Sequence, residues 1–309
     1  MAKFLLGIFE LICQCVSPKY NAAQKFIHSL CQAFSIKSNQ IIIVPGNHDL
    51  NWKLSEDAYQ LFKRKDYKEP LKEGCYIEES ENVIQVPDEN KYKQRFANFK
   101  EFYDAIRTDK ESEILPYSLN YDQQFTLDHF PEHNLLILGL NSAWQLDHHY
   151  KNLASINTNA LANALNKILL KPDYENALKM AVWHHPLNSP FEDRIKDQGF
   201  LEQLAVAGFR FFLHGHIHKA EKSLFSYDIS IKGRRLDGIC AGTFGAPTKE
   251  LMPGYPWQYN LLILEENQLR VKTRRREENN GAWKPDSRWT LGAGKGATDY
   301  YTIMLGNEG

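Results

Sequence analysis

Short apolar runs alternate with amphipathic stretches along the first two thirds of the chain. Four runs have the length of buried strands: Ile41–Val44, Leu135–Leu140, Met180–Trp183 and Phe209–Leu213. Between them, Tyr20–Gln32 and Asn159–Leu170 place apolar side chains along one face at helical spacing. This alternation predicts an α/β core in which functional loops leave the carboxyl ends of the strands.

The pattern changes after His218, where the remaining sequence is typical of β structure. Strands are predicted at Leu261–Leu264, Leu269–Thr273 and Tyr300–Leu305, with a tight turn at Asn280-Gly281. Residues 51–130 are polar and far too many for an ordinary loop, which predicts an insertion with its own helix near Tyr92–Ile106. We expect a main domain over residues 1–265 and a C-terminal β extension over 266–309 that packs on it.

Composition excludes several classes of protein. The 37 Lys and Arg against 38 Asp and Glu give a net charge of -1, which excludes a global attraction to nucleic acid or anionic membrane. The five cysteines form no Cys-x-x-Cys pair, which argues against a disulfide framework and favours a reducing, cytoplasmic setting. The apolar run Phe4–Val16 is too short to span a bilayer and lacks a signal-peptide cleavage site, so we expect buried sheet or helix there.

Three polar clusters each follow a predicted strand: Gly46-Asn-His-Asp49, Trp183-His-His-Pro186 and His214-Gly-His-Ile-His218. Imidazoles, an amide oxygen and carboxylates suit Zn, Mn or Fe. Each cluster alone has an ordinary explanation as a turn, a helix cap or core histidines, and only the combination indicates a metal site. Gly46 is expected to permit a tight turn and Gly215 a bend, while adjacent His184 and His185 are expected to point to opposite faces, so that at most one serves the site.

Together the clusters resemble the calcineurin-like metallophosphoesterase superfamily, whose later motifs run Gly-Asn-His-Asp/Glu, then a His, then Gly-His-x-His. The resemblance implies a four-layer αββα sandwich with two divalent metal ions, Mn, Zn or Fe. It implies Asn47 as a metal ligand, His184 and His216 as ligands of one metal, and His218 as a ligand of the other. It also implies that a metal-bound hydroxide attacks a phosphodiester or phosphomonoester of a nucleotide-like substrate. His48 would stabilise or protonate the leaving oxygen, and Asp49 would orient His48.

The first two motifs of that family, Asp-x-His and Gly-Asp-x-x-Asp, are absent. Residues 1–45 contain no aspartate, one glutamate (Glu10) and one histidine (His28). We therefore expect the family's first strand to be missing or replaced by unrelated sequence, as in a truncated or diverged member. Without the bridging carboxylate two close cations repel, so we expect at most one firmly bound metal and weak hydrolysis or none. The alternative is a catalytically impaired relative that binds a nucleotide or a partner.

Other features carry weaker predictions. Asn141 and Ser142 end a core strand, with structural and functional roles equally supported, and the 241–257 segment could shape a substrate pocket. Residues 147–150 are expected to form a solvated loop. Arg270, Lys272 and Arg274 share one face of a strand, and a phosphate-rich partner such as nucleic acid is a third possibility. The acidic residues that flank this strand favour a mixed solvated surface instead: Glu265, Glu266, Glu277 and Glu278.

Overall fold

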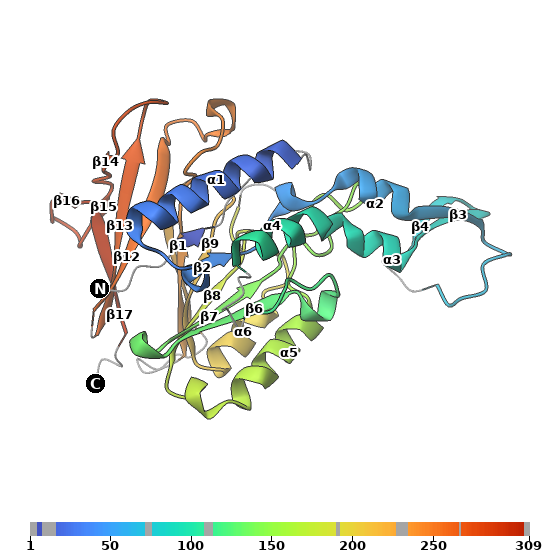
Figure 1. The fold of residues 1–309 in the computed structure, drawn as a ribbon, viewed down its shortest axis with the longest axis horizontal. Coiled ribbons are helices and arrows are strands. Elements are labelled where there is room, and N and C mark those ends of the chain that lie inside the picture. Colours follow the sequence, from blue (N-terminus) through green and yellow to red (C-terminus); the bar gives the residue numbers. More distant parts are fainter. Residues whose placement is uncertain are drawn as a thin grey trace.

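Two β layers face each other between helices (Figure 1). The structure, a computed structural model, describes residues 5–7, 17–71, 76–107, 114–189, 192–226, 234–265 and 267–305. Cys13, Cys15 and Cys75, like most of the run Phe4–Val16, lie outside these ranges, whereas Cys31 and Cys240 are free thiols. In the part of the chain that the structure describes, no helix is long and apolar enough to cross a membrane.

The first layer is a six-stranded sheet in the order β10-β11-β9-β8-β7-β6. Its strands are β6 (Phe125–Phe130), β7 (Leu135–Leu140), β8 (Leu178–Val182), β9 (Phe209–His214), β10 (Glu221–Ser226) and β11 (Arg235–Cys240). Strands β7, β8, β9 and β11 run parallel to one another, while the edge strands β6 and β10 are antiparallel to them. All six residues of β7 are buried, as expected for a strand covered on both faces. The strands predicted near residues 135, 180 and 209 are confirmed.

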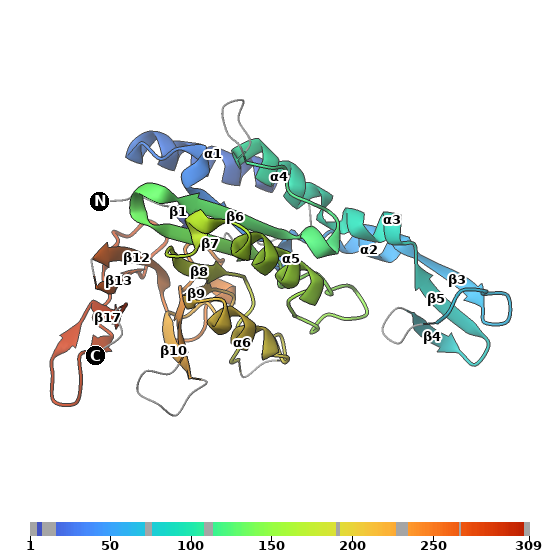
Figure 2. The same cartoon turned by 90° about the horizontal axis from the view of Figure 1, so that it is seen from below.

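Helices α5 (Thr158–Leu169) and α6 (Gly199–Val206) cover one face of this sheet (Figure 2). Leu161 of α5 and Leu204 of α6 are fully buried in one apolar cluster with Leu136 and Leu138 of β7. The helix predicted at 159–170 is therefore confirmed, and its apolar face is buried because it packs against the sheet.

The second layer covers the opposite face of the six-stranded sheet. It contains the parallel pair β1 (Leu5–Gly7) and β2 (Ile41–Ile43), and the sheet of β12 (Trp257–Glu265), β13 (Gln268–Arg276), β14 (Lys284–Pro285) and β17 (Tyr300–Met304). Leu269 and Val271 of β13 pack in one cluster with Val182 of β8 and Phe211 of β9. The expected boundary at residue 265 falls inside the β12–β13 hairpin, so residues on both sides of it belong to one sheet of the sandwich. The division into a main domain and a C-terminal extension stays a prediction.

A short strand precedes α1: β1 pairs in parallel with β2, and its register joins Leu5 to Ile41. The expectation that the family's first strand is missing or replaced stays a prediction. Helices α1 (Ser17–Phe34) and α4 (Ala97–Arg107) pack on this strand pair (Figure 1), with Ile27 and Phe99 in one cluster with Ile43. Both confirm predicted helices.

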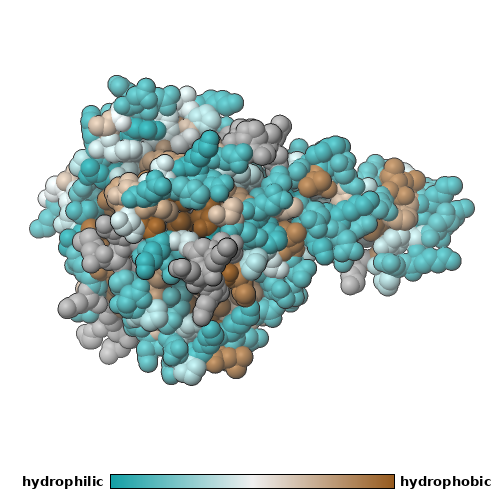
Figure 3. Space-filling view, viewed as in Figure 1, coloured by the Kyte–Doolittle hydropathy of each residue, from teal (hydrophilic) through white to brown (hydrophobic). Residues whose placement is uncertain are grey.

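The insertion forms an arm that projects from the body (Figures 1 and 2). It consists of α2 (Trp52–Ala58), β3 (Tyr59–Lys63), β4 (Ile77–Ser80), β5 (Val83–Pro87) and α3 (Glu89–Tyr92). Its far part shows an apolar patch (Figure 3), and Leu61 on β3 is 66% exposed. The insertion ends before the predicted residue 130, since Phe125–Phe130 forms β6 of the core sheet.

The loop at 147–150 anchors the arm and is not the solvated loop that we expected. Asp147 is buried and accepts hydrogen bonds from the hydroxyls of Tyr59 (2.7 Å) and Tyr92 (2.6 Å). Burial opposes ionisation of Asp147, but these hydrogen bonds and two backbone N–H groups lower its pKa below the ordinary value. The rings of His148 and His149 pack edge-on against Tyr59.

Short 3-10 helices and a small hairpin complete the structure. They are η1 (Ser38–Gln40), η2 (Asn47–Asp49), η3 (Lys93–Phe96), η4 (Tyr121–Gln123), η5 (Pro131–His133), η6 (Pro172–Tyr174), η7 (Thr248–Glu250), β15 (Trp289–Thr290) and β16 (Ala297–Thr298). The predicted tight turn is confirmed between β13 and β14, where the N–H of Gly281 donates to the carbonyl of Glu278.

A buried ion pair joins the layers at the C-terminal end of α4. Arg107, the last residue of α4, is fully buried and donates both to the carboxylate of Asp128 on β6 and to the backbone carbonyl of Ile41. One guanidinium therefore ties α4 to a strand of each layer.

We expect Arg107→Ala to lower the free energy of unfolding by about 3–5 kcal/mol, because Asp128 would remain buried without its counter-charge. Urea denaturation followed by circular dichroism measures the change. The control is Arg64→Ala, which removes an exposed pair with Glu78 on the arm and should leave the midpoint nearly unchanged. A loss no larger than that of the control would contradict the role assigned to Arg107.

Candidate metal centre

Side chains from three loops meet beside the carboxyl ends of β2, β8 and β9. Nε2 of His184 lies 2.9 Å from Oδ1 of Asn47 and 3.0 Å from Nδ1 of His216. Asn47 lies on η2, which follows β2 of the second layer, while His184 and His216 follow neighbouring parallel strands of the first. Because adjacent parallel strands end at the same edge, two of the three predicted clusters necessarily meet there, and β2 brings the third.

These three atoms fit a divalent cation. Two imidazole nitrogens and one amide oxygen crowd together, and both kinds of atom are common metal ligands. Within the described ranges, His184, His185 and His216 form a group whose candidate ligand atoms all lie within 4.8 Å of one another. This donor set suits Zn, Mn or Fe better than Ca or Mg, which prefer oxygen ligands.

Ser142 positions the histidine pair. Its Oγ accepts hydrogen bonds from the backbone N–H groups of His184 (3.2 Å) and His185 (3.0 Å) and lies 2.8 Å from Nδ1 of His185. With both lone pairs used, the hydroxyl proton points at Nδ1 of His185, which therefore acts as the acceptor. Of the two roles considered for Ser142, the structure supports a positioning role at the site.

His185 does not point away from His184 as expected. Its ring centroid lies 4.8 Å from that of His184 and 5.0 Å from that of His216. The prediction is wrong because β8 ends at Val182, so strand alternation no longer applies two residues later. The Ser142 contact nevertheless distinguishes the two rings, since it occupies Nδ1 of His185 while His184 directs Nε2 to Asn47 and His216.

The bend in the Gly-His-x-His motif lies at the histidines and not at Gly215. His216 has φ +70° and His218 has φ +51°, left-handed values that cost a non-glycine residue about 1–3 kcal/mol. Gly215 is not among the residues with positive φ. Strain of this kind is typical of functional sites, where the surrounding structure enforces it.

His218 is separate from the other candidate ligands. Its Nδ1 donates to the backbone carbonyl of Glu250 (2.8 Å), which places the lone pair on Nε2. It does not belong to the compact histidine group found among the described residues. A ligand role for His218 stays a prediction, as does the role of the partly exposed His48.

Asp49 braces the turn that carries Asn47. Its two oxygens accept hydrogen bonds from the backbone N–H of Gly46 (2.8 Å) and the hydroxyl of Tyr20 on α1 (2.9 Å). Orientation of His48 by Asp49 remains a prediction. Gly46 has ordinary extended geometry, with φ −118°, so turn freedom is not why glycine is needed here. A Cβ at this position would lie only 2.8 Å from the His184 ring, so glycine permits the close approach.

No sequence pattern indicated a role for Asp193. Its Oδ2 lies 2.7 Å from Nε2 of His216, on the opposite side of the ring from Nδ1. The hydrogen bond with His216 lowers the pKa of the Asp193 carboxyl, although partial burial opposes this. A carboxylate at Nε2 fixes the imidazole with its lone pair on Nδ1, the atom that faces His184. No motif marks Asp193, since its partner is 23 residues away.

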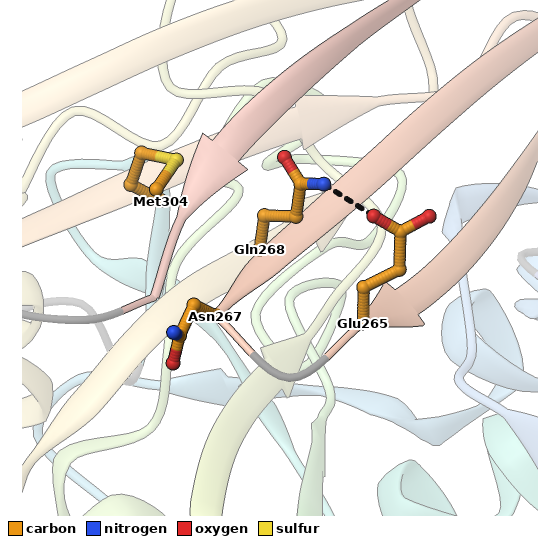
Figure 4. A pocket seen from close by; sticks show the side chains of 4 residues that line it. All are labelled: Glu265, Asn267, Gln268 and Met304. Carbon is orange, nitrogen blue, oxygen red and sulfur yellow. Dashed lines mark hydrogen bonds between the residues drawn. The ribbon is translucent and has the colours of Figure 1, made fainter.

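A surface hollow of about 480 Å³ lies elsewhere and takes no part in this site. Glu265, Asn267, Gln268 and Met304 line it (Figure 4), and Gln268 donates to Glu265. It lies at the far end of β12 from Gln258, whose Oε1 accepts from the N–H of Ala220 beside the histidine loop. The seven residue steps between Gln258 and Glu265 span roughly 23 Å.

We expect Gly46→Ala to weaken metal binding by at least about tenfold, because the added methyl group would push the His184 ring away from Asn47 and His216. Competition with a chromogenic chelator measures the affinity for Zn²⁺. Gly245→Ala is the matched control, since a Cβ there meets nothing within 4 Å. Equal affinities for the two variants would contradict the close-approach argument.

We expect Asp193→Asn to lower metal affinity about 10- to 100-fold, because the amide no longer enforces the tautomer of His216. The melting temperature of the metal-free protein should change little. Asp197→Asn makes the same charge change on an exposed residue of the same segment and should retain affinity. If the metal-free protein is destabilised while affinity is retained, Asp193 is only structural.

The family model described as "Calcineurin-like phosphoesterase" matches residues 16–220, which include all three histidine-bearing clusters. A comparison with curated proteins found no match. Vps29 from Chaetomium thermophilum is 15% identical over 68% of this chain and 76% of its own, with a TM-score of 0.24. A single mutant of Vps29 from Entamoeba histolytica is 14% identical over 67% of this chain and 77% of its own, also with a TM-score of 0.24.

The family model covers well over half of the sequence, and the matched residues include the candidate metal centre. The chain therefore belongs to the calcineurin-like phosphoesterase family.

Proposed function

We propose that the chain is a metal-dependent phosphoesterase that hydrolyses phosphodiester or phosphomonoester bonds of a nucleotide-like substrate, weakly and with one firmly held metal ion. The convergence of Asn47 Oδ1, His184 Nε2 and His216 Nδ1 within hydrogen-bonding distance carries this proposal. These three side chains would hold the ion. A bound divalent cation supplies Lewis-acid stabilisation of charge on a phosphoryl oxygen.

Charge limits the number of metals. Two divalent cations at the usual separation of about 3.5–4 Å repel strongly unless carboxylates lie between them. The compact ligand group in the described ranges consists of imidazoles. Asp193 contacts the far nitrogen of His216, where it orients the ring but does not lie between two ions. This supports one metal and, with it, reduced activity.

His48 is the proposed acid for the leaving group. It follows Asn47 directly on η2, and its side chain is partly exposed at the strand edge where a substrate would bind. An imidazole at this place can donate a hydrogen bond or a proton to the departing oxygen. Asp49, held by Gly46 and Tyr20, fixes the turn from which both Asn47 and His48 project.

The second candidate is a catalytically impaired relative that binds a nucleotide or a partner. The observation in its favour is the lack of both early carboxylate motifs in residues 1–45. Such a protein would retain the histidine cluster and bind a nucleotide without hydrolysing it.

Metal content and turnover distinguish the two candidates. After loading with Mn²⁺ or Zn²⁺ and desalting, we expect one ion per chain by mass spectrometry and slow hydrolysis of bis(p-nitrophenyl) phosphate. Both should be lost in His216→Ala and retained in His28→Ala, which removes an exposed histidine from α1. Two ions with rapid turnover would contradict the single-metal proposal. One ion with nucleotide binding but no turnover would support the impaired relative.

A further inference from the structure

The outer face of the C-terminal sheet carries a row of cations. Along β13 buried and partly exposed residues alternate, so that Leu269, Val271 and Thr273 point into the sandwich. Arg270, Lys272, Arg274 and Arg276 have the opposite parity and lie along the other face, at intervals of about 6.8 Å. Leu261, paired with Lys272 in the neighbouring strand, is 46% exposed, so this part of the face is open to solvent, whereas Trp257, paired with Arg276, is buried.

The nearby acidic residues neutralise only part of this row. Glu265 pairs with Arg270 at 3.1 Å. Glu277 pairs at 3.1 Å with Arg275, which has the inward parity and does not belong to the row. Among the residues that the structure describes, no carboxylate pairs with Lys272, Arg274 or Arg276. The mixed surface expected from the sequence agrees with the Glu265–Arg270 pair at one end of the row, whereas the Arg275–Glu277 pair lies off the row.

Aromatic rings interleave with the cations. The guanidinium of Arg276 lies 4.9 Å from the ring of Trp257 and 5.0 Å from that of Trp283. Phe244 stacks on Trp283 with centroids 5.0 Å apart and is 40% exposed. Tyr259, the strand partner of Arg274, packs edge-on against Trp283 at 4.7 Å. Tyr300 pairs with Lys272 on the other side of β13.

We propose that this face, defined by Lys272, Arg274, Arg276, Phe244 and Tyr259 and here called the outer strand face, binds single-stranded nucleic acid. Cations without carboxylate partners attract the phosphates, and exposed rings beside them offer stacking surfaces for bases, the combination that single-strand binding uses. A duplex keeps its bases paired and gains nothing from the rings. Other polyanions would gain nothing from them either.

One end of the outer strand face borders the loop that contacts His218. Phe244 lies in the loop between β11 and β12, and the same loop supplies the Glu250 carbonyl that holds His218. A strand bound along β13 with a base on Phe244 would therefore approach the histidine loop. Binding itself does not require the proposed hydrolysis, so it can be tested on metal-free protein.

The test is fluorescence anisotropy of a labelled oligothymidylate of about 20 nucleotides with the full chain in EDTA. With three phosphate contacts, log Kd should rise with log salt with a slope of about 2. Lys272→Glu with Arg274→Glu should weaken binding at least about tenfold, and Arg274→Gln less. The control is Lys91→Glu, which makes the charge change of one of these two substitutions on exposed α3 of the arm and should bind like the parent. Melting temperatures confirm that each variant is folded.

Phe244→Ala separates base recognition from simple charge. We expect it to weaken oligothymidylate binding about tenfold while leaving binding of inorganic polyphosphate unchanged, because only bases stack. The proposal is overturned if oligothymidylate does not bind, if binding is independent of salt, or if Lys91→Glu weakens it as much as the double variant. It is also overturned if a duplex or vesicles containing phosphatidylserine bind equally well and Phe244→Ala has no effect, since the face would then attract any polyanion.

Discussion

The parallel register of β7, β8 and β9 is the constraint on which the metal centre depends. Hydrogen bonding between β7 and β8 and between β8 and β9 brings the ends of all three strands to one edge. Ser142, His184 and His216 follow these ends, so a few residues of loop suffice to bring them together. Asn47 arrives from the other layer, which requires the sandwich to be closed. The site is thus a product of the whole core and not of any one loop.

The sequence predicted the parts of this arrangement that depend on local pattern. The runs at 135–140 and 209–213 are nearly unbroken apolar stretches, and each is a strand within a residue of the predicted bounds. The candidate ligands Asn47, His184 and His216 could be named from the sequence because each stands within three residues of the end of such a run, and their role as ligands stays a prediction. The helical spacing of apolar residues also predicted α1 and α5, whose apolar faces pack against a sheet.

Contacts between distant segments could not be predicted in this way. Asp193 belongs to no motif, and only the folded chain brings it to His216. We expected Gly46 to serve a tight turn, whereas glycine is needed there because the ring of His184, 138 positions later, lies against it. The expectation for His185 failed because strand alternation was extended past the end of β8. Likewise, the sequence shows how many charged residues surround β13 but not which face of the strand each occupies. The direction of the side chains decides which of them pair, as Arg275 and Glu277 do.

The arm differs from the body in how its stability arises. Among the described side chains of β3, β4 and β5, only Ile84 is buried. The hydrogen bonds that Asp147 accepts from Tyr59 and Tyr92 therefore carry much of the attachment. A unit with so little core opens at a much smaller free-energy cost than the sandwich does. Amide protons of the arm should accordingly exchange with solvent through local opening, while those of β7 and β8 should exchange only on global unfolding. A protease should likewise be able to cleave the tip of the arm while the histidine cluster stays intact.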